Sequence, residues 1–120
     1  MNDPMKLSVC IDGKIEELEQ LKKELDSMPD VVSNSSAEYE KKLAKTIIQL
    51  KNGVSFNLEG VDVSNPLTTI TEKVARGLCW AEAMKAQLDE IKYKNLNKKI
   101  DIVEAQLNGY QSINRHLSEK

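Results

Sequence analysis

The sequence predicts an all-α protein: an antiparallel helical hairpin or three-helix coiled coil, with one very long C-terminal helix and a small β-hairpin or ordered loop. Three observations predict this fold class. Leucine-type residues recur every seven positions, turn-forming residues separate the periodic stretches, and aromatic residues make up only 4% of the 120 residues. The core must therefore be aliphatic. A thin aliphatic seam buries little surface, so we expect the chain to complete its core as a homo-oligomer.

The first periodic stretch predicts a helix over about residues 14–28, at the start of a single helical domain covering 1–120. Its seven-residue spacing forms two series of apolar side chains: Ile11, Leu18 and Leu25 in one, and Leu7, Leu21 and Met28 in the other. Asp12-Gly13 weakens the beginning of this helix. Met28-Pro29 is expected to end or kink it, because proline lacks the amide donor.

A second helix is predicted over about residues 36–52. Ser35 and Glu38 have the spacing of a capping box, and Gly53 supplies a C-terminal stop. The apolar stripe of this helix consists of Tyr39, Leu43, Ile47 and Leu50.

Residues 54–64 alternate between apolar and polar side chains on either side of Glu59-Gly60, a pattern that predicts a β-hairpin or an ordered loop. An isolated hairpin is marginally stable in water. Phe56 and Leu58 are therefore expected to dock onto the helices.

The longest helix is predicted over about residues 66–117, with Asn65 as its N-cap, Pro66 at its first position and Asn108-Gly109 as a point where it could bend or end. Its apolar residues fall into two registers: Leu67, Ile70, Val74, Ala81, Met84, Leu88 and Ile91, followed by Leu96, Ile100, Val103, Leu107, Tyr110 and Leu117. The simplest topology places the first two helices antiparallel to this one.

The charge balance and the hydropathy pattern exclude several functional classes. Seventeen basic and nineteen acidic residues give a net charge of −2, without the basic excess of a dedicated nucleic-acid binder. No apolar stretch is long enough to cross a bilayer, and none near the N-terminus has the pattern of a signal peptide. We expect a cytosolic protein without a membrane partner.

Few residues suggest chemistry. His116 is the single histidine and has no second ligand at metal-binding spacing, and Cys10 and Cys79 do not form a CxxC pair. Cys79 lacks a neighbouring base. We therefore expect no catalytic residue, no metal site, no cofactor and no enzymatic activity.

The segment 74–84 is apolar around most of its circumference, which is typical of a helix that is buried on more than one side. It provides a candidate interface for another subunit or a partner, formed by Val74, Leu78, Trp80, Ala81 and Met84. A locally thicker core covered by the hairpin at Phe56 and Leu58 explains the pattern equally well.

Two sets of basic residues are candidate contacts for nucleic acid or small anions. The first is Lys92, Lys94, Lys98 and Lys99, which surround Tyr93, an aromatic ring that could stack on a base. The second is Arg76 and Arg115, which could bind a nucleotide at subunit interfaces. For the lysines, a solvated helix face that complements an acidic first helix is the favoured interpretation.

Several motifs resemble those of small uncharacterised coiled-coil proteins of bacteriophages and prophages of Gram-positive bacteria. The matching pieces begin at Met28-Pro29 and continue through 38–45, 52–53, 56–60, 65–66, 69–77 and 106–115. The opening 8–13 departs from the helical start of those proteins. The resemblance implies an early phage gene and transfers no catalytic residues.

These observations lead to one main expectation and two alternatives. We expect a phage-derived, non-enzymatic, oligomeric binding protein that blocks a host defence protein. One alternative is a nucleic-acid-binding accessory of phage replication or recombination. The other is an oligomeric sponge that sequesters a nucleotide signal.

Overall fold

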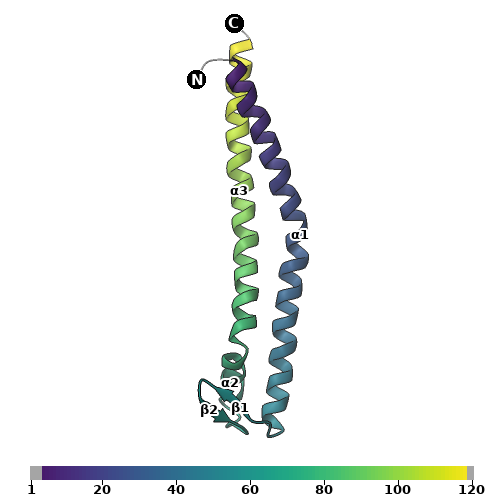
Figure 1. Ribbon diagram of the computed structural model, residues 1–120, viewed down its shortest axis with the longest axis vertical. Helices are drawn as coiled ribbons and strands as arrows, with labels where there is room; N and C mark the ends of the chain where they lie inside the picture. The colour runs from purple at the N-terminus through teal and green to yellow at the C-terminus, as the bar shows by residue number, and fades with distance from the viewer. Residues whose placement is uncertain (1–3, 119–120) are drawn as a thin grey trace. The chain divides into compact units, whose positions relative to one another are not determined.

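The structure is a computed structural model that describes residues 4–118, and these residues form three α-helices and a two-stranded antiparallel sheet (Figure 1). Helix α1 spans Pro4–Lys51, strands β1 and β2 span Phe56–Leu58 and Val61–Val63, and helices α2 and α3 span Thr71–Leu78 and Trp80–Ser118. These elements confirm the predicted all-α class, with its very long C-terminal helix and small β-hairpin.

The described residues fall into two compact units. The first, which we call the leucine unit, contains the described residues up to Pro29 and those from Ile91 onward. The second, which we call the hairpin unit, consists of Asp30–Glu90. The prediction of a single domain over 1–120 stays a prediction.

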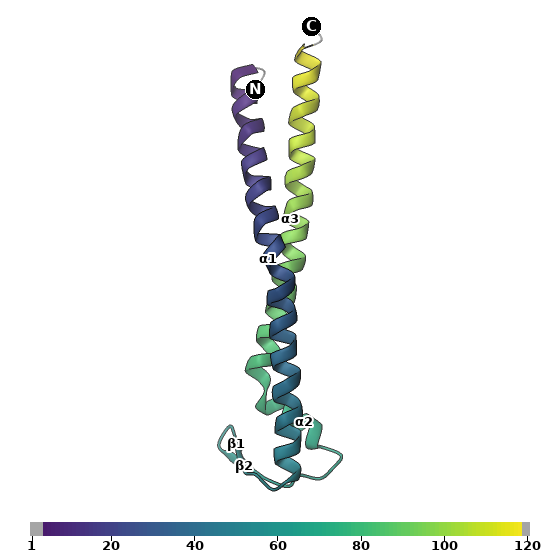
Figure 2. The same ribbon diagram turned by 90° about the vertical axis from the view of Figure 1, so that its right-hand side faces the viewer.

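In the leucine unit, the first part of α1 packs antiparallel to the second part of α3, as the sequence predicts. The described ends of the chain lie at the same end of this unit (Figure 2). Leu21, Ile100 and Val103 form a buried cluster, against which Leu18, Leu25 and Leu96 pack. Lys22 pairs with Glu104 at 3.6 Å beside this cluster. The seven-residue spacing therefore identified the seam of this unit correctly.

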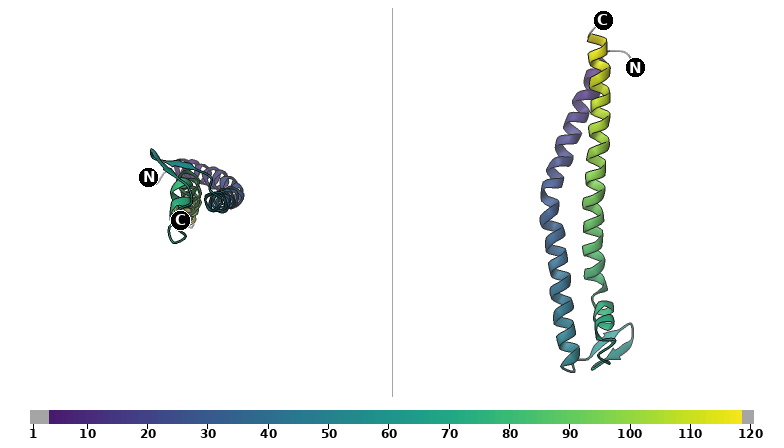
Figure 3. Two further views of the ribbon diagram at one scale, coloured as in Figure 1. Left: turned by 90° about the horizontal axis from the view of Figure 1, so that it is seen from below. Right: turned by 180° about the vertical axis from the view of Figure 1, so that it is seen from behind.

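The hairpin unit contains the second part of α1, both strands, α2 and the beginning of α3. Strand β1 packs against α2 (Figure 3). The strands pair in the register Phe56↔Val63 and Leu58↔Val61, joined by Glu59 and Gly60, which both have positive φ angles of 48° and 86°. A two-residue turn of this kind matches the twist of an antiparallel pair. Phe56 and Leu58 are half-buried, and this confirms the predicted hairpin and its docking.

Two predicted helix boundaries in the first half of the chain are wrong. The helices over 14–28 and 36–52 are one helix, α1, which begins at Pro4 and contains Gly13 and Pro29. Glycine costs a helix only about 1 kcal/mol. The proline costs about 3 kcal/mol, yet buried positions continue before it at Met28 and after it at Ser35. Ser35 donates its hydroxyl to the Val32 carbonyl oxygen (3.2 Å) within the helix instead of capping a new one.

The long helix predicted over 66–117 is also wrong in its first part. Asn65 has a φ of 45°, outside the extended region of an N-cap, and a turn closed by bonds from Ile70 and Thr71 to the Leu67 carbonyl precedes α2. Cys79, at φ −100° and ψ 20°, then separates α2 from α3. Beyond it, α3 continues without interruption through Asn108-Gly109.

Candidate binding surfaces

The inner face of α3 in the hairpin unit is built from small and polar side chains. Those that are half-buried on α3 are Glu82, Ala83, Ala86 and Asp89, and Cys79, which directly precedes the helix, is buried. Opposite them on α1, Thr46 is buried, and its hydroxyl lies 3.5 Å from the Cys79 sulfur. Lys42 donates a hydrogen bond to Glu82, and Lys85 lies 3.9 Å from Glu38.

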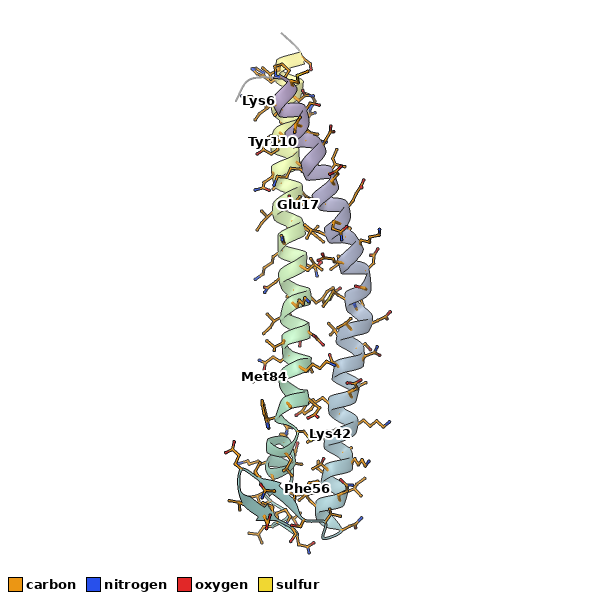
Figure 4. The ribbon with its side chains drawn as sticks, in the orientation of Figure 1. Lys6, Glu17, Lys42, Phe56, Met84 and Tyr110 are labelled. Atoms are coloured by element: carbon orange, nitrogen blue, oxygen red, sulfur yellow. The ribbon has the colours of Figure 1, made fainter. Side chains whose placement is uncertain are left out.

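Met84 and Leu88, two residues of the apolar register predicted for this helix, are exposed instead, and so is the neighbouring Trp80. Trp80, Met84 and Leu88 leave 62%, 52% and 58% of their surfaces accessible. They are four residues apart on one helix, so they occupy neighbouring positions along one face. Figure 4 shows Met84 on the side of α3 that points away from Lys42. We call these three residues the ridge.

Beside the ridge lies an apolar groove of about 720 Å³. The hairpin forms one wall through Leu58, Glu59, Val61 and Val63, and Gly77 and Trp80 form the other. Leu58 comes close to Gly77, where an added Cβ would lie 3.7 Å from its side chain. Trp80 belongs to both the groove and the ridge, so the two surfaces are continuous.

The structure therefore divides the predicted interface into two sets. Trp80, Ala81 and Met84 are exposed on α3, whereas Val74 and Leu78 are half-buried on α2. The prediction missed Leu88 and Val61. Leu88 continues the four-residue spacing of the ridge and could have been found by that signal, whereas Val61 joins the surface only through the fold of the hairpin.

In the hairpin unit, Lys42 forms an ion pair with Glu82 that shifts the pKa values of both groups. The hydrogen bond from Lys42 is the main cause that lowers the pKa of Glu82, and the same bond raises the pKa of Lys42. Cys79 is buried, and Cys10 is half-buried in the leucine unit. Within residues 4–118, no three His, Cys, Asp or Glu side chains are placed to hold a metal ion.

The four candidate lysines do not form a single patch. Lys92 and Lys99 line a recess of about 440 Å³ in the leucine unit together with Glu24 and Ser27 of α1. By the helical repeat of 100° per residue, Lys94 and Lys98 lie on a different side of α3. The basic run is therefore divided between two faces, and one of them includes an acidic side chain.

The remaining basic candidates are exposed and have near neighbours in sequence. Arg76 forms an ion pair with Glu72 at 2.6 Å, and the hydrogen bond to that carboxylate raises the pKa of Arg76. Arg115 lies 3.5 Å from the Ser112 hydroxyl in the leucine unit. His116 is exposed near the end of α3.

No protein-family model matches this chain. Neither a curated protein nor a solved structure matches it either. Across the described helices, none combines the length and the apolar character that a membrane-spanning segment requires.

Proposed function

We propose that this chain is a non-enzymatic binding protein that acts by covering a surface of another protein. The ridge supports the proposal most directly. Contiguous exposed apolar surface on a folded protein often marks a site of interaction with another protein. Trp and Met are also enriched in the cores of protein interfaces.

The resemblance to coiled-coil proteins of phages and prophages suggests the kind of partner. We propose that the partner is a host protein of a defence system, which is blocked when the chain occupies its surface in the bacterial cytoplasm. A blocking protein of this kind needs affinity and shape but no reacting groups. The pairing of Lys42 with Glu82 and of Arg76 with Glu72 is consistent with that role.

The test compares two charged substitutions on α3. The tagged chain and its Met84→Glu variant are used to capture proteins from a host extract, and a captured partner is then purified and titrated by calorimetry. We expect Met84→Glu to weaken binding at least tenfold, because a charge would be desolvated in the interface. Ile102→Glu is the matched control, since Ile102 is an exposed apolar residue of α3 in the leucine unit. Equal binding by both variants would contradict the proposal.

A further inference from the structure

We infer that the ridge and the groove of the hairpin unit bind a second copy of this chain, paired antiparallel about a two-fold axis, with the ridge of each copy in the groove of the other. The inference rests on the proposed function, in which the ridge is a binding surface. It identifies a second copy of the chain as one protein that binds there.

The arrangement of the two surfaces along α3 fits a two-fold pair. The groove lies beside Gly77 and Trp80, and the ridge extends from Trp80 toward Leu88. An isologous interface requires one patch to be complementary to itself. When two such helices lie antiparallel, Met84 and Leu88 of one copy meet the groove of the other, and the same contact is repeated on the opposite side of the axis.

The charges beside the two surfaces are complementary as well. Glu59 is the charged residue that lines the groove. Lys85 follows Met84 in sequence and lies beside the ridge; its side chain is 64% exposed, and its ion pair with Glu38 is long at 3.9 Å. In the two-fold pair, Lys85 of each copy comes near Glu59 of the other. Pairing of opposite charges at the rim favours this orientation over a parallel one.

The area also fits a second copy. Val61 lines the groove and is 61% exposed, so it adds to the apolar surface of the ridge. Covering the ridge and Val61 would bury on the order of 500 Å² in each copy and about 1000 Å² in the pair, near the lower limit of a specific interface. The structure therefore leads us to expect a reversible dimer rather than an obligate one.

The first experiment measures the mass of the full chain by sedimentation equilibrium over a wide range of concentrations. We expect a reversible monomer–dimer equilibrium, which Met84→Glu weakens at least tenfold and Ile102→Glu leaves unchanged. Circular dichroism verifies that each variant is folded. A chain that stays monomeric at millimolar concentration, or a dimer equally sensitive to both substitutions, would overturn the inference.

A charge exchange tests the orientation. Lys85→Glu and Glu59→Lys should each weaken the dimer, because each places like charges at both rim contacts. An equimolar mixture of the two variants should dimerise as the unmodified chain does, since both contacts between unlike copies then join opposite charges. A mixture that dimerises no better than its components would overturn the antiparallel pair.

The two proposals fail in different ways. If the chain is monomeric but Met84→Glu still weakens binding of the captured host partner, the self-association is wrong and the proposed binding function stands. If the mixed charge variants dimerise as expected but Met84→Glu weakens binding of no host partner, the proposed function is wrong and the dimer stands.

Discussion

The two units use α1 and α3 in different ways. In the leucine unit, the seam consists of large aliphatic side chains such as Leu21, Ile100 and Val103, all of which are buried. In the hairpin unit, the buried side chains include one large aliphatic residue, Leu50, and otherwise small or polar ones: Ser35, Thr46, Thr71, Ala75 and Cys79. The large apolar residues of α3 in that unit lie on its outer face instead.

The difference between the two seams suggests that one unit contributes mainly to stability and the other mainly to binding. Burial of aliphatic surface contributes roughly 25 cal/mol per Å², so the leucine seam contributes more per residue than a seam of threonine, serine and alanine. The hairpin unit leaves the corresponding apolar surface of Trp80, Met84 and Leu88 available to another chain. We expect the first unit to hold the helices together and the second to bind.

The largest expected effect comes from truncating the leucine seam. Leu21→Ala should lower the free energy of unfolding by about 2–4 kcal/mol, because it removes a buried side chain and leaves a cavity. Thr46→Ala, at a buried position of the hairpin unit, should cost about 1–2 kcal/mol, since it removes one methyl group, the hydroxyl's bond to the Lys42 carbonyl and its contact with Cys79. Chemical denaturation of both variants measures the difference. Equal losses would remove the distinction between the two seams.

We also expect α1 to unfold locally more easily in the hairpin unit than in the leucine unit. Amides of α1 near Leu21 should exchange with solvent more slowly than amides near Thr46, with a difference in opening free energy of about 1–2 kcal/mol, because opening the second stretch exposes less apolar surface. Native-state hydrogen exchange checks this. It is best measured on the Met84→Glu chain, so that self-association does not protect the hairpin unit. Slower exchange near Thr46 would reverse the assignment of the stable unit.

The same contrast explains how far the sequence could predict the structure. Leu7, Leu21 and Met28, with Ile100 and Val103, were predicted as seam residues and are buried, because nothing competes with a leucine-rich stripe for the inner position. The hairpin was also predictable, since Glu59-Gly60 lies between two alternating stretches and its backbone adopts the left-handed conformations of a tight turn.

The predictions that failed did so for physical reasons. Leu88 belongs to a predicted seam register but is exposed, because periodicity identifies an apolar face but not the surface that covers it. Met84, which the sequence also assigns to the candidate interface, is exposed on the same face. Ala83 and Ala86 occupy the inner positions instead, where their small size lets side chains from α1 fit. Pro29, expected to end or kink the helix, does not end it, because the rest of a long helix can accommodate one missing hydrogen bond. Ligand binding by the candidate lysines and arginines stays a prediction.

Two glycines should give opposite responses to the same substitution. Gly13→Ala should stabilise the leucine unit by about 0.5–1 kcal/mol, because Gly13 is helical and an added methyl group meets no atom within 4 Å. Gly60→Ala should destabilise the hairpin unit by a similar amount, because its φ of 86° is strained for alanine even though the space around it is open. Thermal unfolding of the two variants shows whether each substitution raises or lowers the melting temperature. The hairpin prediction is wrong if Gly60→Ala raises the melting temperature.

The smallest expected effect is the pH dependence of the Lys42–Glu82 pair. The pKa of Glu82 lies below its ordinary value of 4.5, so its stabilising contribution is complete above pH 4.5 and is lost as the pH falls through the lowered pKa. The pKa of Lys42 is raised above 10.5, so its contribution is complete below that pH and is lost as the pH rises through the raised pKa.

Because both side chains are partly exposed, solvent screens the interaction, and we expect it to contribute a few tenths of a kcal/mol near neutral pH. Glu82→Gln should therefore lower the free energy of unfolding slightly at pH 7, and the difference from the unmodified chain should shrink as the pH falls well below 4.5. Denaturant titrations at pH 7, 5 and 3 measure this difference. If it grows on acidification, the pair does not stabilise the hairpin unit through the charged form of Glu82. The inner face of that unit would then depend on its small side chains alone.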